Sequence, residues 1–284
     1  MKTKDEPPSG DLTRGWWHRI EVFIAKPLAE AELERKAYLN SQDGTKVDGK
    51  SITILVSVAV LLTLQYYLVV KGNAFFYLED KLHSSNVSKW LGGADREFYF
   101  MLFWALGQTL LYIVVPLIQI RFFFREPLGE YGLKISGLLK LWGLYLAMLL
   151  VMVPIVVTIS DTQSFQRTYP FYKPHFHEPL WPRFWIWEFA YFLQFVGLEF
   201  FFRGYLLHGV KRQFGAYAIF VMMVPYCMIH FGKPMPETFA AIAAGIILGF
   251  MCLKTRSIWM GAALHISVAL TMDLCSLWRA GRFD

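Results

Sequence analysis

Four ionisable side chains lie within apolar stretches of the C-terminal part of the sequence. They are Glu199, Arg203, His230 and His265. In the interior of a bilayer each such group costs about 2.5–3.5 kcal/mol, so it needs a structural or chemical reason to be there. A carboxylate and imidazoles that are shielded from water can activate a water molecule and polarise a carbonyl group. The set therefore predicts an acid–base site inside a membrane.

The first motif is Gly197-Leu-Glu-Phe-Phe-Phe-Arg-Gly-Tyr205, which contains Glu199 and Arg203. Residues four positions apart share one face of a helix, so this carboxylate and this guanidinium can pair. The intervening phenylalanines are apolar, and the glycine after the arginine lets a second helix approach closely. A buried ion pair that only joins two helices explains this motif equally well.

Two further motifs contribute the histidines. Tyr226 and His230 are four residues apart, so the phenol and the imidazole share a helix face. A histidine at the end of a helix can also be an ordinary interface residue. His265 lies well inside the last apolar run and follows Gly261-Ala-Ala, so a neighbouring helix can come close. A histidine at that depth favours a functional role.

Three acids are additional candidates. Glu188 lies eleven residues before Glu199, about 20° from the same helix stripe. It could extend the row of polar side chains that contains Glu199, or it could lie at the membrane interface beside two tryptophans. Glu237 falls at the start of a helix, where a carboxylate also favours the helix dipole. Asp273 follows His265 by eight residues, about 80° round and about 12 Å along the axis, toward the membrane edge.

The composition of the whole chain indicates a membrane protein, whose apolar helices would hold these groups inside a bilayer. Of 284 residues, 55% are hydrophobic and 18% are charged, with a mean hydropathy of +0.37. The net charge of +6 is spread over the N-terminal tail and short loops, which excludes a nucleic-acid footprint. The three cysteines form no Cys-x-x-Cys pattern. No cleavable signal peptide is visible before residue 51.

We expect an all-α polytopic bundle with about seven transmembrane spans, and six or eight also fit the sequence. The expected spans cover residues 52–70, 98–120, 138–159, 184–207, 214–230, 238–253 and 258–278. The domains predicted are a polar or amphipathic N-terminal segment at 1–50, N-terminal spans at 51–183, a core at 184–278 and a tail at 279–284. More of the 28 lysines and arginines fall on the side of the N-terminal tail, which predicts a cytoplasmic N-terminus.

Across residues 184–278 the motifs resemble the CAAX prenyl protease and bacteriocin-processing group of intramembrane proteases. The family pattern is Glu-Glu-x-x-x-Arg, then Phe-x-x-x-His, then His-x-x-x-Asn. Glu199 matches its second acid, and Arg203, His230 and His265 match the residues of the same type. The pattern differs at three positions, where this chain has Leu198, Tyr226 and Ala269 instead of Glu, Phe and Asn.

The resemblance implies an intramembrane endopeptidase in which a glutamate activates water and histidines orient the water and stabilise the oxyanion. Because Leu198 replaces the acid that the family uses as its base, Glu199, Glu237 or Glu188 would have to supply the carboxylate. The glutamate and two histidines could bind zinc in principle. The family analogy and the lack of a His-Glu-x-x-His motif favour a site without a metal or other cofactor.

The expected partners are the lipid bilayer and a membrane-associated peptide or protein substrate, with or without a lipid attached. A bacterial inner membrane is the expected location. Two other functions stay open. Leu198 and Ala269 motivate an inactive scaffold or immunity-type protein on the same fold. Intramembrane Glu, Arg and His also occur in proton-coupled transporters, but the sequence has no internal repeat to support one.

Overall fold

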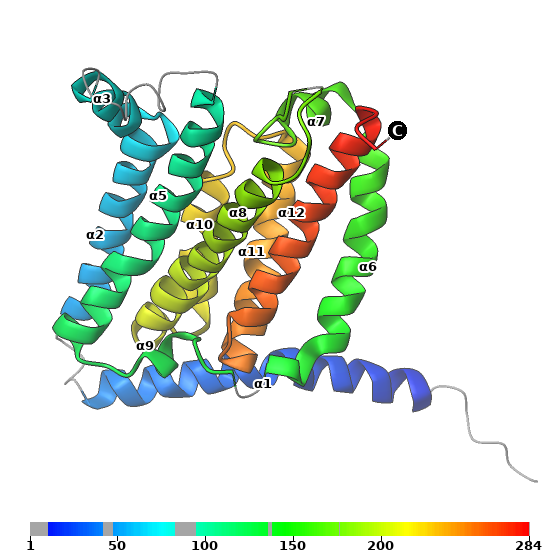
Figure 1. Ribbon diagram of the computed structural model, residues 1–284. Coiled ribbons are helices and arrows are strands. Elements are labelled where there is room, and N and C mark those ends of the chain that lie inside the picture. The colour runs from blue at the N-terminus through cyan, green and yellow to red at the C-terminus, as the bar shows by residue number, and fades with distance from the viewer. Residues whose placement is uncertain (1–10, 42–47, 83–94, 136–137, 176, 284) are drawn as a thin grey trace, which may run out of the picture.

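The computed structural model describes residues 11–41, 48–82, 95–135, 138–175 and 177–283, and within them the fold is helical with no strand. Figure 1 shows most of the long helices side by side in one bundle. The prediction of an all-α polytopic bundle is confirmed. The main α-helices are α1 (Asp11–Ser41), α2 (Gly49–Leu64), α3 (Asn73–Lys81), α5 (Arg96–Ile118), α6 (Trp142–Ile159), α7 (Gln163–Thr168), α8 (Arg183–Glu199), α9 (Gly209–Phe214), α10 (Ala218–Met228), α11 (Met235–Thr255) and α12 (Trp259–Arg279).

Five helices of the described chain are long and apolar enough to cross a membrane, judged by length and composition. They cover Gly49–Val70, Arg96–Phe124, Trp142–Ile159, Met235–Thr255 and Trp259–Arg279. The other two expected spans also form helices, α8 and α10, but neither meets these criteria. α10 has only 11 residues, which extend about 16 Å, roughly half of a hydrocarbon core.

Helix α8 passes into a π-helical segment, Phe200–His208, and then into α9, so one helical rod runs through the bundle. Every side chain of this π-helical segment is buried. Glycines allow neighbours to come close: a Cβ atom on Gly204 would lie 2.6 Å from the Tyr131 carbonyl oxygen. Wide π-helical turns are often found at functional sites, and this one begins directly after Glu199.

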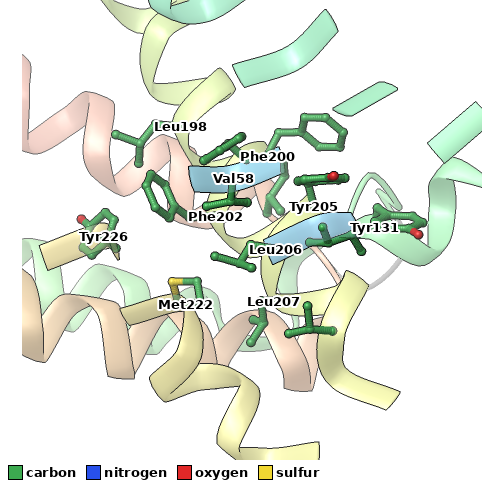
Figure 2. Packing of buried hydrophobic residues seen from close by; sticks show 14 of the residues in the cluster. Val58, Tyr131, Leu198, Phe200, Phe202, Tyr205, Leu206, Leu207, Met222 and Tyr226 are labelled. Atoms are coloured by element: carbon green, nitrogen blue, oxygen red, sulfur yellow. The ribbon is translucent and has the colours of Figure 1, made fainter. Parts of the chain in front are cut away.

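The main apolar core surrounds this rod. It includes Phe201, Phe202 and Leu206 from the π-helical segment and Met222 from α10. In the view of Figure 2, Leu198 and Tyr226 lie on one side of this core and Tyr131 lies on the other. The well-packed aromatic rings of this core therefore hold one side of the polar motifs on α8 and α10 in place.

The helices alternate in direction, and α1 lies across one end of the bundle (Figure 1). That end also carries the connections after α5, α9 and α11. These connections therefore lie at the same end of the bundle as the N-terminal helix. α8 and α12 run antiparallel and are neighbours, so residues late in α8 face residues early in α12.

Candidate active site

Glu199 and Arg203 form the buried centre of the site. Nη1 of Arg203 lies 3.1 Å from Oε1 of Glu199, and the two side chains are 0% and 1% exposed. The pairing expected from their spacing of four residues is confirmed. Two opposite charges removed from water are stable only as partners, so this pair keeps the carboxylate ionised and fixed in position.

His265 of α12 contacts the same carboxylate oxygen. Its Nδ1 atom lies 2.8 Å from Oε1 of Glu199, and its side chain is 19% exposed. The close approach of α12 depends on Gly261, one turn before the histidine. A Cβ atom at that position would lie 2.7 Å from Oε2 of Glu199. The small residue before His265 is therefore what allows the imidazole to reach the carboxylate.

Tyr226 of α10 and His230, which lies two residues beyond the end of α10, complete the cluster. The Tyr226 hydroxyl lies 3.0 Å from Nε2 of His265. The rings of Tyr226 and His230 are 4.9 Å apart in an edge-to-face arrangement, and Nδ1 of His230 lies 2.8 Å from the Tyr226 carbonyl oxygen. The Tyr226 ring also lies 6.3 Å from the ring of His265, so both histidines lie beside this tyrosine.

Glu188 and Asp273 lie apart from this cluster and contact each other. Both are 0% exposed, and their carboxyl groups lie within hydrogen-bonding reach of one another. No hydrogen bond of regular geometry reaches any of the four oxygens among the described residues, and the Trp187 side chain is the donor that lies beside Asp273. Both acids are therefore covered by neighbouring helices, because α8 and α12 pack against each other. Their position relative to the membrane interface stays a prediction.

Glu237 lies in a third polar group. Its carboxylate accepts hydrogen bonds from Nζ of Lys233 at 2.7 Å and from the Tyr169 hydroxyl at 2.8 Å. Burial, first of all, and the nearby Glu237 carboxylate raise the pKa of the Tyr169 phenol well above its usual value. Glu237 is thus engaged by its own partners and makes no described contact with Glu199, His230 or His265.

The sequence did not point to two of the contacts. Phe195 of α8 stacks on the His265 ring, with centroids 5.6 Å apart. Phe195 precedes Glu199 by four residues, so their shared helix face could have indicated this contact. Tyr169 comes from a loop, where no periodic pattern predicts which helix a side chain meets.

Among the described residues, no group of three or more His, Cys, Asp or Glu side chains is placed to hold a metal ion. Glu199 and His265 touch, while Nδ1 of His230 is engaged by a backbone carbonyl. The prediction of a metal-free and cofactor-free site stays a prediction.

The geometry can be compared with known families. Residues 179–271 match the family model described as Type II CAAX prenyl endopeptidase Rce1-like. The matched range contains Glu199, Arg203, His230 and His265. Comparisons with curated proteins and with solved structures gave no match. The resemblance stated from the motifs is confirmed over residues 179–271, the part of this integral membrane protein that matches the type II CAAX prenyl endopeptidase family model.

Proposed function

We propose that the chain is an intramembrane endopeptidase that hydrolyses a peptide bond of a membrane-associated substrate. The observation that carries the proposal is the row Glu199–His265–Tyr226, joined by contacts of 2.8 and 3.0 Å within the bundle. A carboxylate that orients an imidazole, which in turn meets a hydroxyl, is a recurrent acid–base arrangement. The family supports peptide hydrolysis, and the name of the family suggests a prenylated C-terminal peptide as the first substrate to test.

The contacts suggest how the carboxylate acts. Glu199 is held by Arg203 and His265, so it acts by fixing His265 rather than by taking a proton from water itself. Among the described residues, no hydrogen bond involves Nε2 of His230. Its Nδ1 atom faces a carbonyl oxygen, which can only accept a hydrogen bond, so Nδ1 carries the proton and Nε2 keeps its lone pair. We assign water activation to Nε2 of His230, in place of the acid missing at Leu198.

The test is cleavage of a prenylated peptide by the purified protein in nanodiscs. Glu199→Gln, His230→Ala and His265→Ala should each reduce kcat by about 100-fold or more, because His230→Ala removes the base and the other two variants remove the groups that fix the site's geometry. His175→Ala is the matched control, because His175 lies exposed in the loop before α8 and should leave kcat unchanged. Full activity in all three variants would exclude this site.

An inactive membrane scaffold is the second candidate, and one observation favours it. Leu198 and Ala269, which stand where the family has a glutamate and an asparagine, are 5% and 6% exposed and pack in apolar clusters. A scaffold predicts that the wild type cleaves none of a panel of prenylated and unmodified peptides. It also predicts that the histidine variants lower only the thermal unfolding temperature.

We also propose a cytoplasmic N-terminus and a bacterial inner membrane. The end of the bundle that carries α1 also carries Lys211, Arg212 and Arg256, and basic residues gather on the cytoplasmic side of membrane proteins. Cysteine labelling in intact cells tests this orientation. A cysteine placed at exposed Lys36 should react only after the membrane is permeabilised, and reaction in intact cells would reverse the assignment.

A further inference from the structure

The Tyr226 hydroxyl has a defined direction. With Nδ1 of His265 against the Glu199 carboxylate, the proton of the imidazole belongs on Nδ1, which leaves Nε2 as a hydrogen-bond acceptor. In this tautomer the Tyr226 hydroxyl, 3.0 Å away, donates to Nε2. Its hydrogen points into the cluster of Glu199, His230 and His265 rather than toward lipid.

The Tyr226 ring is held on several sides. The Arg203 guanidinium lies over it, with Cζ 4.0 Å from the ring centroid, and His230 meets it edge-to-face. The residue is 1% exposed, and a Cβ atom on Gly245 of α11 would approach its Cδ1 atom to 3.2 Å. A ring fixed in this way gives the hydroxyl a single position, as a preorganised donor requires. The nearby guanidinium also stabilises negative charge that develops beside it.

Hydrolysis of a peptide bond needs such a donor. The tetrahedral intermediate carries a negative oxygen, and in a site shielded from water the protein must supply hydrogen bonds to it. His265 cannot donate from Nε2 while Nδ1 holds the proton. One turn further along α12, Ala269 offers no polar group and packs with Trp187 and Tyr191. Tyr226 is the neutral donor that lies in contact with the histidine.

We propose that Tyr226 is a further catalytic residue, whose hydroxyl stabilises the oxyanion of the reaction. The proposal rests on the proposed peptidase function. Nε2 of His230 takes one proton from water as the water oxygen bonds to the carbonyl carbon. The carbonyl π electrons move to oxygen, and rotation about its C–O bond turns the Tyr226 hydroxyl from Nε2 of His265 to this oxyanion. When the intermediate collapses, the C–N bond breaks and His230 returns the proton to the leaving nitrogen.

The test is Tyr226→Phe, which keeps the ring beneath Arg203 and removes only the hydroxyl. It should lower kcat by about 100- to 1,000-fold, the usual cost of losing one oxyanion donor, with little change in KM. Tyr205→Phe is the matched control. Tyr205 is also fully buried, and its hydroxyl bonds to Ser57 at 2.6 Å, in the core away from His265. It should lose stability and keep its kcat.

A second readout separates catalysis from packing. Fluorotyrosines incorporated at position 226 make the phenol more acidic with little change in shape, so kcat should vary steadily with the number of fluorines. A phosphonate analogue of the tetrahedral intermediate should bind Tyr226→Phe more weakly by the factor lost in kcat/KM. Full kcat in Tyr226→Phe, while Glu199→Gln is inactive, would overturn this inference alone. No cleavage by the wild type would overturn the proposed function and this inference together.

Discussion

The same two helices, α8 and α12, carry two buried polar contacts of opposite character. Glu199 meets His265 and has Arg203 as its cation, whereas Glu188 meets Asp273, and no ion pair to either of these two acids is found among the described residues. The contacts are separated by about 16 Å along α8 and about 12 Å along α12. Because α8 and α12 are antiparallel, a single alignment of the two helices brings both pairs of residues together.

The difference shows what each contact requires. Glu199 can remain an anion, since its charge is balanced within the protein. Two carboxyl groups in contact without a cation cannot both ionise, so the acid pair (Glu188 and Asp273) must hold a proton between them. The first contact therefore presents fixed charges, and the second joins the same helices through a hydrogen bond between acids.

Removing the cation should have the largest effect. Arg203→Met leaves Glu199 charged and buried without its ion-pair partner, which we expect to lower the free energy of unfolding by about 3–5 kcal/mol. Unfolding of the purified protein in mixed micelles measures this change. The control is Lys134→Met, which breaks a 2.8 Å pair with Glu130 whose side chains are both 40% exposed and should cost less than about 1 kcal/mol. Equal losses would mean that Glu199 is not a buried anion.

A matched pair of amide substitutions tests the comparison itself. Glu199→Gln removes the negative charge beside Arg203 and should cost about 3 kcal/mol, because a buried guanidinium loses its partner. Glu188→Gln should change the stability by less than about 1 kcal/mol, because the amide can donate to Asp273 in place of the shared proton. The same unfolding measurement covers both variants. The reverse order would show that the acid pair is the charged contact.

The approach of α12 to Glu199 can be blocked by a single methyl group. Gly261→Ala places Cβ 2.7 Å from a carboxylate oxygen that Arg203 and His265 hold in place, so it should destabilise the protein by about 1–3 kcal/mol. Gly143→Ala in α6 is the control, because nothing lies within 4 Å of its added Cβ, and it should be neutral or slightly stabilising. A harmless Gly261→Ala would mean that α12 can shift without penalty.

The smallest effect is expected where an ion pair lies at the end of the bundle. Burial opposes ionisation of Glu126, but hydrogen bonds from Lys50 and Tyr131 outweigh it and hold the pKa of this carboxyl below its usual value. A lowered pKa adds stability above the unfolded-state value, and this stability is lost as the pH falls below about 5. In Glu126→Gln the free energy of unfolding should therefore change less with pH in the acidic range. An unchanged dependence would exclude Glu126 as a contributor.

Contacts within one helix could be predicted from the sequence. Glu199 with Arg203, and Tyr226 with His230, follow from a spacing of four residues, and Gly261 indicated the close approach at His265. The family and the helical bundle were also predictable, because the motifs and apolar runs are local features.

Contacts between helices were harder to predict. Glu188 and Asp273 are 85 positions apart, and their meeting depends on the antiparallel register of α8 and α12, which hydropathy does not encode. α10 ends at Met228, two residues before His230, and hydropathy alone did not indicate this end of the helix. The sequence shows that Leu198 departs from the family motif, but only the packing shows that this side chain belongs to the apolar core.

The position of α1 across the end of the bundle has a consequence for synthesis. Its partners come from the far end of the chain: Glu34 pairs with Lys211 and Arg256, and the Phe23 carbonyl accepts a hydrogen bond from Lys254. A ribosome adds about 5–20 residues per second, so α1 leaves the ribosome roughly ten seconds or more before these partners exist. During that interval α1 lacks these partners, so this end of the bundle closes only after α11 has been made.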